Sequence, residues 1–251
     1  MSGARGPLPG QIAVIAGSGF SDWAGQSPGQ AVPTRYGSPS AAIRTLRYGP
    51  RRVYVLARHG ESHAIPPHRI NYRANLAALE QLKVEHVVAL NTVGVIRPGL
   101  APGQLAVPRQ LIDYTYGRDH SIHDGNSANL DHIDFTEPFS GALRGWILGA
   151  ARASGVPCHD GGVYAVTQGP RLETAAEVDR LEHDGADFVG MTAMPEASIA
   201  RELQMNYACL SLIVNFAAGR GDKAIHEDIE ASLLAARTQS LRLLQQLFGQ
   251  E

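Results

Sequence analysis

The sequence predicts an α/β protein: a single domain, residues 1–251, with a mixed and mostly parallel β-sheet flanked by helices. Short apolar runs alternate along the chain with segments of helical spacing, which is typical of strands joined by crossover helices. The 251 residues provide enough chain for a substantial core. An apolar share of 44% beside 18% charged residues is ordinary for a globular protein and excludes wholesale disorder.

In the first half of the chain, apolar runs bounded by turn residues predict strands, and one segment with leucines at helical spacing predicts a helix. The expected strands are residues 12–16, 53–57, 87–90, 105–107 and 111–114, and the expected helix is residues 71–82. The strand at 87–90 is expected to close at Asn91-Thr92-Val93-Gly94.

In the second half, Thr174 is a favourable N-cap for a helix, and the last helix is amphipathic. The expected helices are residues 141–154, 174–183, 195–203 and 227–248, and the expected strands are residues 163–167, 188–190 and 209–215. Residues 116–137 form the least regular stretch and are rich in Asp and His. Long loops in compact domains are more often functional than not, so we expect a role for this one.

Small or hydrogen-bonding residues stand at four strand ends. They are Gly17-Ser18-Gly19, Arg58-His59, Asn91-Thr92-Val93-Gly94 and Met191-Thr192. In an open α/β sheet such ends lie together and ligands bind in the crevice between them. Hydroxyls, a guanidinium, an imidazole and backbone N–H groups together suit a tetrahedral oxyanion.

Several other classes of function are disfavoured. The formal charge of −2 gives no basic footprint for nucleic acid or a membrane surface. The Gly17-Ser18-Gly19 turn lacks the third glycine of a dinucleotide site, and no Walker-type Gly-Lys-Ser/Thr occurs. His59-Gly60-Glu61-Ser62-His63 lacks the metalloprotease spacing, and His120, His123 and His132 in the Asp-rich loop are more simply surface residues, so we predict no metal.

The compartment is expected to be the cytoplasm. Two cysteines, Cys158 and Cys209, are too few for a disulfide framework, and Cys209 lies in an apolar run typical of a core strand. The first eleven residues contain no apolar run for a secretory signal, and residues 207–219 are too short to span a bilayer.

Six motifs in order resemble the trimeric purine nucleoside phosphorylases, and most nearly the 5′-methylthioadenosine phosphorylase branch. The resemblance covers about residues 12–245. It is carried by Gly17-Ser18-Gly19, Arg58-His59, Asn71-Tyr72-Arg73-Ala74-Asn75, Asn91-Thr92-Val93-Gly94, the segment 168–177 (QGPRLETAAE) and the segment 190–196 (GMTAMPE). One departure is Thr92-Val93, where relatives usually have two small residues.

The resemblance implies phosphorolysis: inorganic phosphate attacks the anomeric carbon of a purine nucleoside, and no cofactor is needed. By analogy phosphate is held by Ser18, Arg58, His59, the Thr92 backbone and Thr192. Met191 is expected against the ribose, and the base between Glu173 and Asn215. The residues expected to carry the catalysis are then Asn215, Glu173 and His59. Simpler interpretations are that Glu173 caps the turn before Thr174 and that Asn215 is a satisfied polar group at a strand end.

The residues at the base favour a 6-oxopurine. Glu173 can accept a hydrogen bond from N1–H, while Asn215 can donate to O6 and accept from a protonated N7. Adenine reverses this donor and acceptor pattern. In adenosine-cleaving relatives the Glu173 position is typically serine, and aspartates follow the strand where this chain has Ala217 and Gly219.

At the 5′ end of the sugar, the resemblance implies an apolar pocket. Relatives that act on ordinary nucleosides place a histidine near the start of the last helix, and the corresponding position here is Ile229, with Leu233 one turn later. The alternative is that both belong only to the helix core face. By analogy the protein is a homotrimer with shared active sites, and His132 of the partner subunit closes this pocket.

These features together favour S-methyl-5′-thioinosine as the substrate, giving hypoxanthine and 5-methylthioribose 1-phosphate. A 5′-methylthioadenosine phosphorylase and an inosine or guanosine phosphorylase are the alternative enzymes. A purine-binding module without turnover is the alternative from another class, although Arg58, His59 and Asn215 are all present.

Overall fold

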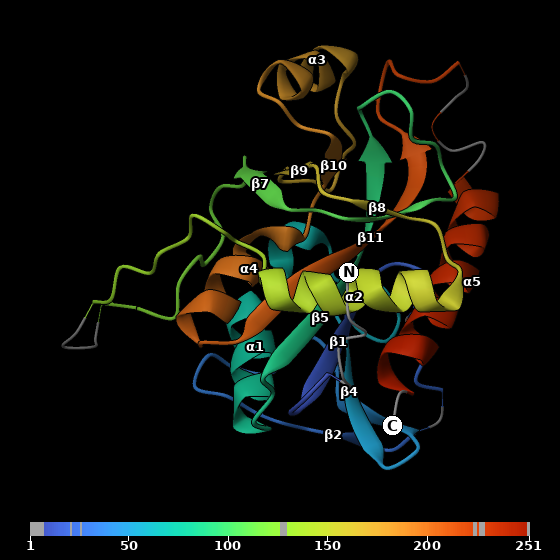
Figure 1. Cartoon of the computed structure of the whole chain (residues 1–251). Helices are drawn as coiled ribbons and strands as arrows, with labels where there is room; N and C mark the ends of the chain where they lie inside the picture. Colours follow the sequence, from blue (N-terminus) through green and yellow to red (C-terminus); the bar gives the residue numbers. More distant parts are fainter. Residues whose placement is uncertain are drawn as a thin grey trace.

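A computed structural model describes residues 8–20, 22–25, 27–125, 130–222, 225 and 229–249. Within these residues eleven strands form one sheet, with helices on both of its faces (Figure 1). The strands are β1 (Ile12–Ala16), β2 (Gly29–Gln30), β3 (Ile43–Tyr48), β4 (Arg51–Ala57), β5 (His86–Val95), β6 (Leu105–Val107), β7 (Gln110–Asp113), β8 (Cys158–Asp160), β9 (Val163–Val166), β10 (Phe188–Gly190) and β11 (Asn206–Phe216).

The helices are α1 (Tyr72–Gln81), α2 (Gly141–Ser154), α3 (Ala175–His183), α4 (Ala193–Glu202) and α5 (Ile229–Phe248), with a 3₁₀ turn at Pro67–Arg69. The main strand order is β2-β3-β4-β1-β5-β10-β9-β7, and β11, β6 and β8 branch from β5. Most of the pairings are parallel, while β2–β3, β3–β4, β5–β10 and β6–β11 are antiparallel. The predicted α/β architecture with a mixed, mostly parallel sheet is confirmed.

The alternation of side chains along β1 explains the layering. Ala13 and Ile15 point into a core that contains Leu76 of α1 and Ile199 of α4. Ile12 and Val14 point to the opposite core, which contains residues of α2 and α5. Because successive side chains of a strand face opposite sides, a strand apolar at every position must be covered on both faces.

Side-chain caps set the starts of three helices. The Asn71 side chain accepts a hydrogen bond from the backbone N–H of Ala74 at the start of α1, and Ser140 caps α2 in the same way. Thr174 caps α3 and forms a full capping box with Glu177, as the sequence indicated for Thr174.

The strands differ from the prediction in the length of β5 and in the presence of β2, β3 and β8, which were not predicted. β5 does not close at Asn91 but continues to Val95, because β11 accompanies it to that point and β10 joins at Gly94. β3 was not predicted: Arg44 and Arg47 interrupt its apolar residues, and it is a partly exposed strand paired antiparallel with β4. The short strand β8 was also missed, because it is held in place by β6 rather than by its own pattern.

The start of one helix differs from the prediction, and the start of another is not tested. α4 begins two residues earlier than expected, with a non-helical backbone at Met194. α5 begins at Ile229, and the expected start at residue 227 lies outside the described residues. The described part of the loop 116–137 contains no helix or strand and projects from the body of the protein (Figure 1).

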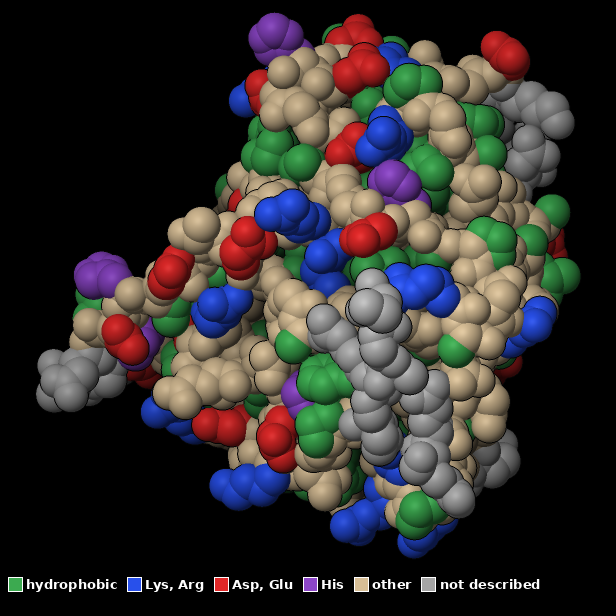
Figure 2. Space-filling model, in the orientation of Figure 1, with side chains coloured by type: hydrophobic (Ala, Val, Ile, Leu, Met, Phe, Trp, Pro, Cys, Tyr) green, Lys and Arg blue, Asp and Glu red, His purple; other side chains and the backbone are tan. Residues whose placement is uncertain are grey.

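None of the described helices combines the length and hydrophobicity needed to cross a membrane. Acidic and basic side chains are interspersed on the face drawn in Figure 2, in keeping with the small net charge.

Candidate functional site

A pocket of about 440 Å³ lies where the sheet opens beside β5. β1 pairs with β5 only as far as Ala89, and β10 joins β5 only from Gly94. Residues 90–93 of β5 therefore have one edge without a neighbouring strand. Such a switch in strand order at the carboxyl ends of parallel strands is where α/β proteins bind ligands.

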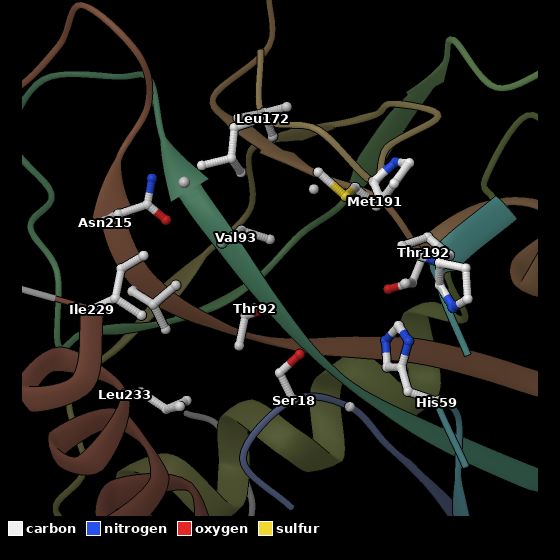
Figure 3. Close-up of a pocket in the computed structure, with 18 of the residues that line it drawn as sticks. Ser18, His59, Thr92, Val93, Leu172, Met191, Thr192, Asn215, Ile229 and Leu233 are labelled. Atoms are coloured by element: carbon white, nitrogen blue, oxygen red, sulfur yellow. The ribbon is translucent and has the colours of Figure 1, made fainter. Parts of the chain in front are cut away.

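The structure brings the predicted residues together in this pocket, with the exception of His132. Its polar walls include Ser18, Arg58, His59, Thr92 and Thr192, and Glu173, Met191, Asn215, Ile229 and Leu233 line the remainder. Figure 3 shows His59 and Thr192 on one side, and Asn215, Ile229 and Leu233 on the other, with Ser18 between them.

Arg58 is fully buried and makes a bidentate ion pair with Glu196. Its Nε and one terminal nitrogen each lie 2.8 Å from a Glu196 oxygen, and the other terminal nitrogen donates to the Leu90 carbonyl at 2.9 Å. Burial alone lowers the pKa of Arg58, but the Glu196 charge outweighs it and holds this pKa above its usual range. Three of the five N–H donors are thus occupied, and the cation is fixed at the pocket wall.

Glu196 is a residue that the sequence analysis did not single out. Its carboxylate also accepts from the hydroxyl of Tyr207, which lies against Cys209. Burial raises the pKa of the Cys209 thiol to about 12, in agreement with its interpretation as a core residue. The buried network holds Arg58 from behind, and its members lie too far apart in sequence for a local pattern to have indicated it.

His59 is a neutral imidazole at neutral pH. Burial and the neighbouring Arg58 charge lower the pKa of His59 to about 4. Its Nδ1 lies 2.8 Å from the Ile65 carbonyl, so Nδ1 carries the proton and Nε2 is left as a hydrogen-bond acceptor. The ring of His63 lies 4.6 Å from that of His59, and its Nε2 is 3.4 Å from the Ser18 hydroxyl.

Thr192 presents a hydroxyl that already accepts one hydrogen bond. The Asn91 side-chain amide donates to Thr192 Oγ1 at 2.8 Å, and both residues are buried. A hydroxyl that accepts in this way still has its own proton to donate. Asn91 therefore holds the Thr192 hydroxyl at the N-terminus of α4, where it lines the pocket and can donate its proton to a ligand.

A β-bulge places Asn215. The register between β11 and β5 shifts between Ile213 and Asn215, so that Asn215 pairs with Gly94. A Cβ atom at Gly94 would lie 2.9 Å from Asn215 Nδ2, so only glycine leaves room for this side chain. The Asn215 amide donates to the Phe216 carbonyl at 2.7 Å, which orients it at the pocket. Bulges commonly redirect a side chain in this way beside a site.

Glu173 does not cap α3. The capping acid is Glu177, whose carboxylate accepts from the Thr174 backbone at 2.7 Å and pairs with Arg171. The simpler interpretation of Glu173 as a capping acid is therefore wrong. Glu173 instead lines the pocket, and Thr167 donates a hydrogen bond of 2.7 Å to its Oε1.

Ile229 and Leu233 make the opposite wall apolar. Both line the pocket, and Leu233 also packs against the core below α5. Ile225, Leu172 and Ile65 add to the apolar lining and were not foreseen, nor was His63 as a pocket residue. No local signal marked these residues, because each comes from a loop whose path depends on the fold.

An arginine of the Asp- and His-rich loop supports the site from outside the pocket. Arg118 donates to the Met191 carbonyl at 2.9 Å and to the Gln168 carbonyl at 2.9 Å. It thereby ties together the two segments that carry Met191 and Glu173. His132 of the same loop is exposed and does not line the pocket of its own chain.

Comparison with known proteins identifies relatives along nearly the whole chain. Residues 11–249 match the model of the phosphorylase superfamily. A protein of Pseudomonas syringae pv. tomato, named "Probable S-methyl-5'-thioinosine phosphorylase", is 49% identical over 85% of this chain and 87% of its own. A "6-oxopurine nucleoside phosphorylase" of Pyrococcus furiosus is 41% identical over 87% of this chain and 84% of its own.

The fold is also similar to a solved structure, methylthioadenosine phosphorylase from Schistosoma mansoni in complex with adenine. The two superpose with a TM-score of 0.87 at 29% identity, over 95% of this chain and 90% of that one.

Proposed function

The chain belongs to the phosphorylase superfamily, and we propose that its pocket catalyses the phosphorolysis of a purine nucleoside, with S-methyl-5′-thioinosine as the preferred substrate. The observation that carries this proposal is one cavity with three kinds of wall: a cationic, hydroxyl-rich side, a carboxylate–amide pair and an apolar end. These walls suit phosphate, a 6-oxopurine and a methylthio group respectively. The names of the relatives support the same reaction.

Phosphate is proposed to bind against Ser18, Arg58, His59 and Thr192, with inorganic phosphate as co-substrate and no cofactor. Arg58 and the two hydroxyls donate to its oxygens, while the neutral His59 accepts from the protonated oxygen of the anion. Alternate residues of a strand direct their backbone groups to the same edge. Since the Leu90 carbonyl faces the open edge of β5, the Thr92 N–H faces it too and is available to phosphate, whatever the size of its side chain.

The base is proposed to bind between Glu173 and Asn215. As a phosphate oxygen bonds to C1′, the C1′–N9 bond breaks and its electron pair goes to the purine, on which negative charge develops. Hydrogen phosphate gives up its proton to solvent and the purine takes one up from solvent at N7, so the base leaves neutral. Asn215 donates to O6 and accepts from the proton on N7, and Glu173 accepts from N1–H. These contacts strengthen as the charge develops, so they lower the barrier rather than only binding the substrate. Met191 is proposed to pack against the ribose.

The apolar end is proposed to receive the 5′-methylthio group. Ile229 and Leu233 offer no partner for a 5′-hydroxyl, and burying an unpaired hydroxyl costs about 1–3 kcal/mol. A methyl group gains about 1 kcal/mol on burial there. Together these effects amount to about 2–4 kcal/mol, so we expect methylthioinosine to exceed inosine in kcat/KM by roughly 30- to 1,000-fold.

The test is purine release from methylthioinosine, inosine and methylthioadenosine, each with and without phosphate and with and without a chelator. We expect release only with phosphate, unaffected by chelation and fastest with methylthioinosine. Ile229→His is expected to narrow the gap between methylthioinosine and inosine by giving the hydroxyl a partner. Release without phosphate would indicate hydrolysis and reject phosphorolysis. No release from any nucleoside would reject the enzyme and favour a purine-binding module.

We further propose a homotrimer that works in the cytoplasm, with His132 of the partner subunit closing the 5′ end of each pocket. The exposed position of His132 on a projecting loop, away from the pocket of its own chain, supports this arrangement. Light scattering of the active enzyme is expected to give the mass of three chains. His132→Ala is expected to raise the KM for methylthioinosine with little effect on the KM for phosphate, and a fully active monomer would refute the trimer.

A further inference from the structure

We infer that Thr167 is a positioning residue for base recognition: its hydroxyl holds one oxygen of Glu173 so that the other faces the purine. The inference rests on the proposed function and concerns how the pocket tells a 6-oxopurine from a 6-aminopurine. Thr167 lies at the end of β9 and does not line the nucleoside pocket, so it acts only through Glu173.

The contact between the two residues is direct and short. Thr167 Oγ1 lies 2.7 Å from Glu173 Oε1 and 3.3 Å from the Gly190 carbonyl. A hydroxyl has one proton, and Gly190 already accepts from the Thr167 backbone N–H at 2.8 Å. The proton therefore goes to Glu173, where the bond is shorter and the acceptor is a carboxylate.

Thr167 itself is held rigidly. Its backbone N–H is paired with Gly190, and its carbonyl accepts from Arg118 at 3.2 Å. The adjacent α3 begins with a complete capping box, so the chain on both sides of Glu173 is fixed. Among the described residues, however, Thr167 is the one hydrogen-bond partner of the Glu173 side chain.

Glu173 also lines a second cavity of about 300 Å³, so its carboxylate has space to turn away from the nucleoside pocket and into this cavity. Thr167 lines that cavity as well, together with Arg171 and Arg180. Arg171 pairs with Glu177 and Arg180 with Asp184, but both remain cations within the same cavity wall. Without the Thr167 hydroxyl, these charges would draw the Glu173 carboxylate away from the nucleoside pocket.

The expected effect is on selectivity. Glu173 recognises N1–H, which a 6-oxopurine has and a 6-aminopurine lacks. A hydrogen bond to a charged group corresponds to roughly 10- to 100-fold in an equilibrium or rate. Thr167→Val removes the hydroxyl at nearly constant shape, so we expect kcat/KM for methylthioinosine to fall by about that factor while that for methylthioadenosine changes little.

The experiment measures the ratio of kcat/KM for the two nucleosides in wild type, Thr167→Val, Thr167→Ser and Glu173→Ala. Loss of folded enzyme cancels in the ratio, so a purely structural role leaves it unchanged. Thr167→Ser keeps the hydroxyl and is expected to retain the wild-type ratio. The double variant Thr167→Val with Glu173→Ala is expected to show the same ratio of kcat/KM for the two nucleosides as Glu173→Ala alone, since Thr167 acts only through Glu173.

Thr115→Val is the matched control. Thr115 also donates a 2.7 Å hydrogen bond to a carboxylate, that of Asp113, but lines neither cavity. It is expected to leave the ratio unchanged. If Thr167→Val kept the wild-type ratio of kcat/KM for the two nucleosides while Glu173→Ala lost it, this inference would be wrong and the proposed function would stand. A wild-type enzyme without any 6-oxopurine preference would instead overturn the proposed substrate.

Discussion

Replacing Arg58 by alanine is expected to reduce kcat/KM for phosphate by ~100- to ~1,000-fold. Enzymes lose about this much activity when one hydrogen-bond donor to an oxyanion is removed. The same change leaves Glu196 buried without its cation. Breaking a buried ion pair by removing one partner costs about 3–5 kcal/mol, so the free energy of unfolding should fall by that amount. Both effects have one cause, because the guanidinium that pairs with Glu196 is also the proposed ligand of phosphate.

The two effects are separated by measuring the phosphate KM, turnover and denaturant unfolding on the same samples. Arg58→Lys keeps a charge but cannot repeat the bidentate contact, so it is expected to lie between wild type and Arg58→Ala. Arg44→Ala is the control, because Arg44 forms a partly exposed pair with Glu61 outside the pocket. Arg44→Ala should lower the free energy of unfolding by no more than about 1–2 kcal/mol and leave the phosphate KM unchanged. An Arg58→Ala or Arg58→Lys enzyme with the wild-type phosphate KM would contradict the proposed phosphate site.

Glu173→Ala is expected to abolish the preference for a 6-oxopurine. In sites that hydrogen-bond a substrate group, discrimination against an analogue that cannot make the bond reaches about 10⁴-fold. We expect kcat/KM for methylthioinosine to fall by ~100- to ~10,000-fold, and that for methylthioadenosine to change little, because adenine offers no proton at N1.

Glu182→Ala is the control for this change. Glu182 is an exposed carboxylate of α3 that pairs with Arg220 and lines neither cavity, so its loss should lower stability by no more than about 1 kcal/mol without altering base preference. If Glu173→Ala retained the wild-type ratio of the two nucleosides, Glu173 would not be the base-recognition residue, and the argument for a 6-oxopurine substrate would fall with it.

The sequence determined the fold class and most of the strand ends that meet at the pocket. β1, β10 and α2 have the predicted bounds, because each is a strong local signal: an unbroken apolar run, or a helical stretch between a serine cap and a glycine. The residues expected to bind phosphate, base and sugar were inferred from the motifs and their order along the chain. Most of these motifs stand at strand ends, which lie together in such a sheet whatever segments connect the strands.

The tertiary structure decided what holds those residues in place. Arg58 and Glu196 are 138 positions apart, and no local pattern links them. The bulge that aims Asn215 depends on the register between β11 and β5, and the extension of β5 to Val95 depends on strands from distant parts of the chain. Propensity and periodicity are properties of neighbouring residues, whereas pairing register, buried counter-charges and the partners that orient a carboxylate arise only when remote segments pack together.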